Sequence, residues 1–478
     1  RVERRGLSLQ LGACHRMQRL SWRSVAVAAI AGHPRSAVAF ASGVDDASAD
    51  SVPAECTKYP IDFYAQAMYD FTRYRELTVE QLEYYDGFCE RRRRSCVTLR
   101  AVEGSIFVVD MFPGYQSRLR ATLLAIYRVA LRFPPLADFQ IIVDVSDGEL
   151  QRLDLPILMI THRVEAPVGI LYPDFTFYNW PESTCPTERS HAHSYLLSAF
   201  ARNASLEVAP WEAKEDTLFW RGGRIDNPVR EAAVRQLQAT PATDVDFVTW
   251  RAVSVSGGNE VPGCTGLLEQ CRHRYLAFLD GTTYSSRLKY QLLCGSTVLA
   301  APPVFVEWWT HLLRPGEHFA EAARDMGDAG TVLSDLRRQP ERAREIASRG
   351  QSFALSALSA DAVDCYWWNI FRMAGHGGLP PPPGPLPPHA QPLEDVLLWP
   401  VDATLSSAGV GGSRIVQMVR PPRELQDPSC FQGGLAWEEC CNTELFGPAG
   451  NTQCWRIDRV SGEELGFERC CHSASLKK

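Results

Sequence analysis

Short apolar runs alternate with amphipathic segments through the central part of the chain, and this alternation predicts an α/β protein. Residues 139–145 are apolar at most positions and end in polar turn residues, which is typical of a strand buried on both faces. Residues 117–132 instead carry apolar side chains at helical spacing. The same reasoning predicts further strands at 96–100, 105–110, 157–161 and 217–221, and further helices at 228–237, 331–336 and 340–353.

The stretch 271–301 carries the most informative pattern in the chain. Residues 274–279 form an apolar run and predict a strand, 286–293 have the apolar stripe of a short helix, and 297–301 predict a second strand. A strand, a helix and a strand in this order form a βαβ-like unit, whose first loop opens at the carboxyl end of the strand. Open α/β sheets bind nucleotides at that end.

The loop after the first of these strands has chemistry that suits a phosphate group. Hydroxyl and backbone N–H groups gather just before the predicted helix, and helix N-termini attract anions. Arg287 follows them and can neutralise a diphosphate through a bidentate contact. An ordinary turn with a surface arginine would look the same, so the loop alone leaves both interpretations open. The hydroxyl-bearing residues are Thr282, Thr283, Tyr284, Ser285 and Ser286.

A carboxylate follows the predicted strand 139–145. Asp147 lies in the sequence Ser-Asp-Gly-Glu, directly after the strand ends. Side chains at the carboxyl end of a parallel strand point into the cleft of an α/β domain, where a carboxylate can act as a general base. Asp-Gly is also common in plain turns, so the position by itself permits either role.

A second loop carries arginines and leads into a helix. The predicted strand 217–221 continues into Gly223 and Arg224, and Asn227 then caps a helix that has proline at its first position. Arg224 and Arg230 would face a diphosphate from this second helix start, which makes physical sense for an anionic leaving group. For either arginine alone, a surface salt bridge is the structural alternative.

A motif within the stretch 271–301 is much more specific than these separate features. Residues 275–296 read Tyr-Leu-x(4)-Gly-x(3)-Ser-x-Arg-x-Lys and then Leu-x-Cys-Gly-Ser, which resembles the core motif of glycosyltransferase family 90. That family includes the Rumi-type protein O-glucosyltransferases, fungal capsule-associated xylosyltransferases and plant and algal relatives. The segments 172–182, 219–230 and 303–319 also resemble family segments, and the resemblance spans roughly residues 56–374.

This resemblance assigns roles to particular residues. It implies that Asp147 is the catalytic base and that the loop 282–287 holds the UDP-sugar. Gly223 stands where the family usually has serine, so only a backbone contact remains possible there, and Arg224 and Arg230 occupy the matched cationic positions. The implied fold is GT-B-like, with two Rossmann-like domains facing a cleft. The implied reaction inverts the anomeric carbon and uses no metal and no cofactor, since arginines supply the positive charge.

Composition bears on the compartment and on the partners. The chain has 15 cysteines among 478 residues, several of them in disulfide-like spacings, which favours a secretory compartment. The resemblance implies two disulfides, Cys271–Cys294 and Cys56–Cys365. A net charge of −7 gives no indication of nucleic-acid binding or of a polybasic membrane surface. No apolar run reaches the length of about 18 residues that a conventional transmembrane helix needs.

The chain divides into five predicted parts. The leader is either a signal peptide or a disordered segment, and the two interpretations remain open. In the last part, two similar cysteine clusters follow each other, and their spacing favours disulfides over zinc. The parts are a leader at 1–54, a Rossmann-like domain with the catalytic base at 55–205, a UDP-sugar-binding Rossmann-like domain with closing helices at 206–374, a proline-rich linker at 375–424 and a cysteine-rich duplicated module at 425–478.

Taken together, these features predict an inverting, metal-independent glycosyltransferase of the secretory-pathway lumen, in the endoplasmic reticulum or Golgi. It would move glucose or xylose from a UDP-sugar to a hydroxyl of a protein or polysaccharide acceptor. A different class remains open, because the glycine at position 223 replaces a family hydroxyl. In that alternative, the chain is an inactive relative that binds carbohydrate through its cysteine-rich tail.

Overall fold

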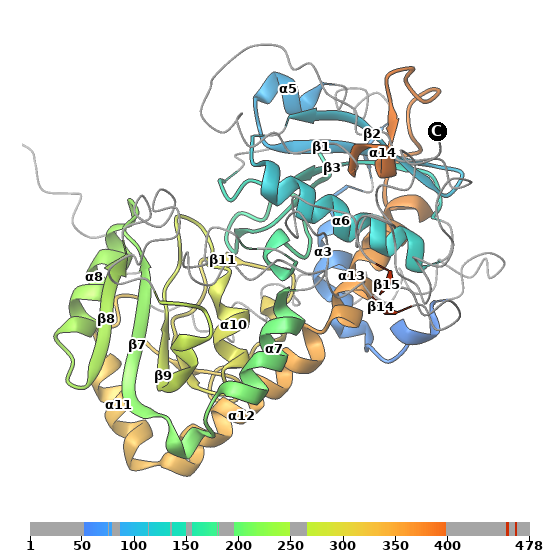
Figure 1. Cartoon of the computed structure of the whole chain (residues 1–478). Helices are drawn as coiled ribbons and strands as arrows, with labels where there is room; N and C mark the ends of the chain where they lie inside the picture. Colours follow the sequence, from blue (N-terminus) through green and yellow to red (C-terminus); the bar gives the residue numbers. More distant parts are fainter. Residues whose placement is uncertain are drawn as a thin grey trace, which may run out of the picture.

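The computed structural model describes residues 52–74, 76–78, 87–112, 114–133, 136–149, 155–178, 180, 196–248 and 265–397, together with 456–457 and 464–465. Nearly all of the leader predicted for 1–54 and most of the cysteine-rich segment 425–478 lie outside these residues, apart from the paired strands β14 (Arg456–Ile457) and β15 (Glu464–Leu465). Figure 1 shows two lobes, each built on a β-sheet. The first lobe comprises the described residues of 52–180 and 360–397, and the second lobe comprises those of 196–357.

The first lobe is built on a mixed sheet with the strand order β13-β2-β1-β3-β4-β6. β1 pairs antiparallel with β2 and β3, whereas β3, β4 and β6 run parallel. This differs from the Rossmann-like sheet that the sequence predicted for 55–205, because the hairpin of β1 and β2 adds antiparallel strands on one side. The strands are β1 Cys96–Val102, β2 Ser105–Phe112, β3 Phe139–Asp144, β4 Ile157–Met159, β6 Ile170–Leu171 and β13 Gln391–Pro392.

Helices around this sheet bury the apolar stripes that the sequence indicates. In α6, Leu119, Leu123 and Ile126 recur at helical spacing, and all three are buried. Helix α13, drawn in orange in Figure 1, lies beside α6. The helical elements are η1 Ala54–Cys56, η2 Ile61–Tyr64, α3 Ala65–Thr72, α5 Phe88–Arg92, α6 Gln116–Arg132, η3 Phe175–Phe177, α13 Ala360–Met373, the π-type turn η9 Ala374–Gly378 and α14 Leu393–Leu397.

The second lobe is built on a parallel sheet with the order β12-β10-β9-β7-β8. The chain adds β8 on one side of β7 and then crosses to add β9 on the other, so the strand order reverses between β7 and β9. The strands are β7 Glu215–Gly223, β8 Thr243–Val248, β9 His273–Phe278, β10 Thr297–Ala300 and β12 Ala320–Glu321. The helices are α7 Leu196–Glu207, η6 Trp211–Ala213, α8 Pro228–Gln238, η7 Glu269–Arg272, α10 Arg287–Leu293, η8 Thr310–Leu312, α11 Ala329–Arg338 and α12 Pro340–Ala357.

Buried aromatic rings join the two lobes into one continuous core. The ring of Trp308, which lies between β10 and β12 in the sequence, is 4.3 Å from the ring of Tyr366 on α13 and 5.6 Å from that of Phe63. Two short strands, β5 (His162–Arg163) and β11 (Phe305–Val306), pair antiparallel across the same boundary. The lobes are therefore packed on each other through large apolar surfaces, which fixes the relation between their loops.

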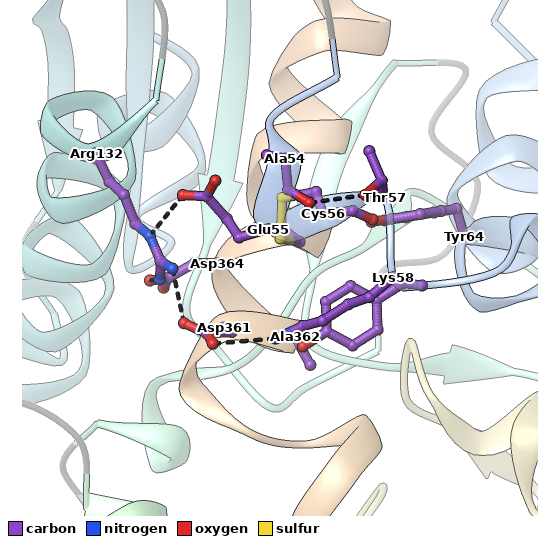
Figure 2. The surroundings of a disulfide bond; sticks show 12 residues. Ala54, Glu55, Cys56, Thr57, Lys58, Tyr64, Arg132, Asp361, Ala362 and Asp364 are labelled. Atoms are coloured by element: carbon purple, nitrogen blue, oxygen red, sulfur yellow. Dashed lines mark hydrogen bonds and ion pairs between the residues drawn. A yellow bond between two sulfur atoms is a disulfide. The ribbon is translucent and has the colours of Figure 1, made fainter.

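A disulfide ties the start of the described chain to α13 (Figure 2). Cys56 and Cys365 are bonded, and both are fully buried. Beside them, Arg132 of α6 donates to Asp364 at 2.7 Å and to Asp361 at 2.7 Å. The hydrogen bond from Arg132 holds the pKa of Asp361 below its ordinary value. The disulfide and this ion-pair cluster together hold α13 on the first lobe, far along the chain from the residues it contacts.

Residues 379–397 lie along the first lobe, whereas the sequence predicted a proline-rich spacer from 375 to 424. Strand β13 extends the first sheet by pairing with β2, and α14 buries three apolar side chains. The buried Arg100 donates to the carbonyl of Pro385 at 2.9 Å and to Gln140 at 2.6 Å. Proline-rich composition predicts an extended chain, but it does not reveal the sheet edge on which that chain packs.

Disulfide mapping tests this architecture. Peptide mapping without reductant should recover Cys56–Cys365, Cys89–Cys96 and Cys271–Cys294. The first of these joins residues 309 apart and the last joins residues 23 apart. The chain-entropy description gives about 6 and about 3 kcal/mol respectively, so alanine at both ends of the first pair should lower the melting temperature more. Free thiols at these positions in the mapped protein would contradict the fold.

Candidate glycosyl donor site

The carboxyl ends of β7 and β9 lie side by side at the point where the strand order of the parallel sheet reverses. A cavity of about 300 Å³ opens there, lined by residues that follow β7, by residues that follow β9 and by Arg163 of the first lobe. Open α/β sheets bind ligands at such a switch point because the two neighbouring loops leave in opposite directions and open a crevice. The structure thus brings together the two loops that the sequence singled out.

Asn227 connects the two loops. Its side-chain oxygen caps α8 by accepting from the backbone N–H groups of Val229 and Arg230 at 3.0 and 3.1 Å, as the sequence predicts. Its Nδ2 donates to the carbonyl of Gly281 in the β9 loop at 2.7 Å. Gly281 is needed because a Cβ there would lie 2.4 Å from the carbonyl oxygen of Tyr284. One cap residue therefore holds a tight turn of the neighbouring loop in place.

Arg230 holds the same two loops through hydrogen bonds to their backbone carbonyls. Its buried guanidinium donates to the carbonyls of Asp280 at 2.6 Å, Gly223 at 3.1 Å and Leu279 at 3.3 Å. Burial lowers the pKa of Arg230 to about 9, which leaves the group charged at neutral pH. The sequence predicted a diphosphate contact for Arg230. The structure shows three of its donors directed at the carbonyls of two strand ends, so this arginine shapes the cavity that it also lines.

Arg287 begins α10 directly behind this turn. Its guanidinium lies over the Trp220 ring, 5.9 Å from the centroid, and its buried Nη1 has no hydrogen-bond partner within the part of the chain that the structure describes. A Cβ on Gly222 would lie 3.2 Å from this Nη1 and 2.5 Å from the Trp220 ring, so glycine makes room for both side chains. Burial lowers the pKa of Arg287 to about 10, so it stays charged at neutral pH. A buried charged donor without an acceptor is costly, and an anion is the acceptor that fits.

Arg224 and Gly223 are the other two residues at the end of β7 that lie at positions of the family motif, and they differ in exposure. Arg224 is largely exposed, where it pairs with Glu231 at 3.2 Å and lies 4.4 Å from the centroid of the Phe247 ring. An exposed pair of this kind holds its side chain weakly, so Arg224 is able to turn towards the crevice. Gly223 ends β7, and its carbonyl is the one that Arg230 binds.

The hydroxyl groups of the β9 loop divide into two sets. Tyr284 and Ser286 face inward and donate to the buried carboxylate of Asp174 at 2.6 and 3.2 Å. Thr282 is exposed and Ser285 is half-buried, and neither hydroxyl bonds to another described residue. The hydroxyls of Tyr284 and Ser286 are thus bonded inside the protein, and the contact of these two residues with the UDP-sugar stays a prediction. The sequence of this loop has no feature that distinguishes the hydroxyls that face the interior from those that do not.

A buried charge network lies under the loop and fixes its shape. Lys289 of α10 lies 3.3 Å from Asp174 and 3.4 Å from Glu307, and all three side chains are buried. Trp309 donates to Glu307 at 3.3 Å. Burial raises the pKa of Glu307 to about 7, against the opposing effect of Lys289. Because each of these groups has partners, the network anchors the loop to both lobes at once.

Asp147 lies across the boundary from the β9 loop and contacts it. The hydroxyl of Thr283 donates to the backbone carbonyl of Asp147 at 2.5 Å. The carboxylate of Asp147 is about half exposed and lies 3.4 Å from the guanidinium of Arg118 on α6. The predicted base and the predicted donor loop, which lie 136 residues apart in sequence, are therefore joined directly.

The backbone around Asp147 is fixed from its own lobe as well. The buried carboxylate of Asp144 pairs with Arg94 and accepts the N–H of Ser146 at 2.8 Å. Arg94 also donates to the carbonyl of Gly148 at 2.7 Å. Burial raises the pKa of Asp144, and the contacts with Arg94 oppose that shift. The residues on both sides of Asp147 are thus held while its own carboxylate remains accessible.

Comparison with known proteins identifies the family. The profile of Glycosyl transferase family 90 matches residues 54–375, which is most of the chain. The chain belongs to glycosyltransferase family 90. It is 26% identical over 289 residues to protein O-glucosyltransferase 1 of Rattus norvegicus, covering 58% of this chain and 72% of the relative. It is 21% identical over 369 residues to the O-glucosyltransferase rumi homolog of Aedes aegypti, covering 69% of this chain and 90% of the relative.

Solved structures give a weaker likeness. HepE of Anabaena in complex with UDP-glucose is 12% identical and overlaps 36% of this chain and 52% of its own, at a TM-score of 0.26. The same protein with UDP and glucose gives a TM-score of 0.25 over 35% and 50% of the two chains. These scores lie well below those of proteins that share one fold, so membership of family 90 rests on the sequence match.

Two further properties of this family 90 glycosyltransferase concern metals and membranes. Within the described ranges, no group of three or more His, Cys, Asp or Glu side chains is arranged to hold a metal ion. In the same part of the chain, no helix has both the length and the apolar character needed to cross a membrane.

Some residues of the site were missed from the sequence. Asp174 follows a proline in the aromatic segment 172–182, and nothing in that segment indicates that it receives the hydroxyls of the β9 loop. Asp280 lines the cavity, and burial raises the pKa of its carboxyl to about 6. Arg118 looks like one more arginine on an amphipathic helix. These contacts cross between lobes or between neighbouring loops, so no local pattern predicts them.

The division of the loop hydroxyls can be tested with two substitutions. Tyr284→Phe removes a donor from the buried carboxylate of Asp174 and should lower the free energy of unfolding by about 1–3 kcal/mol. Ser285→Ala, one position along, removes a hydroxyl with no partner among described residues and should leave that energy unchanged to within about 0.5 kcal/mol. Chemical denaturation of both variants checks this. Equal losses would contradict the assignment of Tyr284 to the interior.

Proposed function

We propose that this glycosyltransferase moves a sugar from a UDP-sugar to a hydroxyl group of an acceptor, with inversion at the anomeric carbon and without a metal ion. The observation that carries the proposal is the contact between Thr283 and Asp147. It brings an accessible carboxylate to the loop that lines the cavity, and Arg287, which follows the same loop, has a buried Nη1 without a hydrogen-bond partner among the described residues. A direct displacement on a sugar diphosphate requires a base and an anion site, and here the two are carried by loops that contact each other.

The diphosphate of the donor would bind at the switch point. Arg287 has an unused buried donor there, and a phosphate oxygen would satisfy it. The hydroxyls of Thr282 and Ser285 are without partners in the described residues and are able to bind the same group, while Arg224 closes from the exposed side. The charge of Arg230 adds to the field without direct contact. Together these groups would stabilise UDP as it leaves, which is the work that a metal ion does in other transferases.

The reaction proceeds as a single displacement. The acceptor oxygen forms a bond to the anomeric carbon while the bond from that carbon to the UDP oxygen breaks, and the electron pair leaves with UDP. The acceptor proton passes to the carboxylate of Asp147, which acts as general base. Attack from the side opposite to UDP inverts the configuration. The negative charge that develops on UDP falls next to Arg287, where burial from water strengthens the attraction.

The names of the relatives narrow the substrates. The matched proteins of rat and of Aedes aegypti are O-glucosyltransferases, and the first is a protein O-glucosyltransferase. We therefore favour glucose over xylose, and a protein hydroxyl over a polysaccharide. The disulfides Cys56–Cys365, Cys89–Cys96 and Cys271–Cys294 support a lumenal site in the secretory pathway, because such bonds persist in oxidising compartments.

Removing the base separates catalysis from donor binding. Asp147→Asn keeps the shape of the side chain but cannot take up a proton, so turnover of UDP-glucose should fall by roughly 10²–10⁴-fold. The affinity for UDP should change little, because the carboxylate lies on the acceptor side. Release of UDP and calorimetric binding of UDP measure the two quantities. Near-normal turnover in this variant would remove Asp147 from the mechanism, and absence of turnover in the parent would instead favour a carbohydrate-binding relative.

Removing the buried cation tests the donor site. Arg287→Ala loses a charge-assisted contact of roughly 1.5–3 kcal/mol, so the dissociation constant of UDP should rise about tenfold to a hundredfold. Arg287→Lys should restore only part, since an ammonium group does not reproduce the planar fork.

Calorimetry with free UDP is the measurement, because it leaves sugar and acceptor aside. Arg272→Ala is the control, since Arg272 is exposed, pairs with Glu215 and Glu269, and does not line the cavity. The control should bind UDP like the parent. If Arg287→Ala also does so, the diphosphate does not bind at this loop.

A further inference from the structure

We propose that Arg118 is a positioning residue for the catalytic base, holding one carboxylate oxygen of Asp147 so that the other faces the acceptor hydroxyl. The inference rests on the proposed function, in which Asp147 is the base. Its first support is contact. Nη1 of Arg118 lies 3.4 Å from Oδ2 of Asp147, and the arginine side chain is 13% exposed against 49% for the aspartate. A nearly buried cation thus holds one edge of an accessible carboxylate.

Aromatic rings fix the guanidinium of Arg118. Its Cζ lies 4.4 Å from the ring centroid of Tyr115 and 4.9 Å from that of Phe175. Phe175 is buried, whereas Tyr115 is about half exposed at the start of α6. Stacking on two rings removes much of the freedom that a long side chain otherwise has, so the contact with Asp147 has a defined direction. A flexible surface arginine would not provide such direction.

Ser95 anchors both of the chain segments that carry Arg118 and Asp147. Ser95, just before β1, accepts the N–H of Tyr115 on its Oγ at 2.7 Å and the N–H of Val145 on its carbonyl at 3.0 Å. Tyr115 precedes α6, which carries Arg118, and Val145 follows β3 and leads to Asp147. The two functional side chains therefore leave from chain segments that one residue ties together.

The remaining contacts of Asp147 leave its second oxygen for the substrate. Thr283 binds the backbone carbonyl of Asp147 and not its carboxylate. The neighbouring acid, Glu149, pairs with Arg163 instead of Arg118. Arg118 thus pairs with Oδ2 of Asp147, and Oδ1 of Asp147 can accept the hydroxyl that is to be deprotonated. Orientation of this kind is worth about 10²-fold in rate when it is lost.

A matched set of variants tests the proposal, with UDP-glucose as donor and water as acceptor. Arg118→Met keeps the length of the side chain and its contact with the rings but removes the charged fork. It should lower kcat roughly 10- to 100-fold, while the dissociation constant of UDP stays within about twofold because the donor loop is untouched. Arg118→Lys should restore part of kcat, since it keeps the charge without the planar geometry.

Arg274→Met is the control for loss of a stacked arginine. Arg274 lies 4.6 Å from the ring centroid of Trp211 and 3.8 Å from Asp216, near the amino end of β9 and away from the cavity. It should lose stability without losing kcat. If Arg118→Met keeps parental kcat, or weakens UDP binding as much as it lowers kcat, the positioning role is excluded.

A double variant separates this claim from the proposed function. If Arg118 acts through Asp147, adding Arg118→Met to Asp147→Asn should cost little further turnover, because two residues that act as a unit are not additive. Fully multiplicative losses would show that Arg118 acts independently and would overturn the positioning role, with the base assignment intact. If Asp147→Asn alone keeps its turnover, the proposed base fails and the positioning claim fails with it.

Discussion

The cavity at the switch point, which is the candidate donor site, depends on one buried guanidinium. At the switch point, two parallel strands end side by side and their chains leave in opposite directions, so carbonyl groups at the strand ends lose the partners that a sheet provides. Arg230 supplies donors to three of these carbonyls, from Gly223, Leu279 and Asp280. A lysine has no planar fork with which to span them. These hydrogen bonds tie together the two strand ends between which the cavity lies.

The second constraint is that the proposed reaction needs parts from both lobes. The proposed base follows a strand of the first sheet, and the proposed anion site follows strands of the second. Three features hold these parts in register: the buried ion pairs of Lys289 with Asp174 and Glu307, the hydrogen bond from Thr283 to Asp147, and the aromatic core around Trp308. Because the ion pairs are buried and satisfied, breaking one partner would leave an uncompensated charge. The contacts that stabilise the fold therefore also set the distance between the proposed base and the proposed UDP-sugar site.

Much of the fold could be predicted from local pattern. The helix expected at 228–237 is Pro228–Gln238, with Asn227 as its cap, because the capping residue and the apolar stripe are local signals. The mixed first sheet was not predicted, since a buried strand looks alike in parallel and antiparallel sheets. The docking of 379–397 on the first sheet was not predicted either, because proline content indicates extension and not the packing partner.

For the site, residue types were predictable and orientations were not. The sequence predicted the loop after β9 from its run of hydroxyls, but it did not show that Tyr284 and Ser286 turn to Asp174, which lies 110 and 112 residues away in sequence. It also singled out Arg230 and Arg287, but not that Arg230 donates to backbone carbonyls while Nη1 of Arg287 has no partner among the described residues. Long-range packing decides such differences, and a single sequence does not record it.

Hydrogen exchange of the full chain, with and without saturating UDP, tests the central claim that the nucleotide binds between the two loops of the switch point. Slowly exchanging amides report local stabilisation by a ligand. The account predicts that UDP slows exchange in residues 222–230 and 281–287 together, and in Asp147 through its contact with Thr283. Slower exchange confined to other segments, or in only one of the two loops, would contradict it.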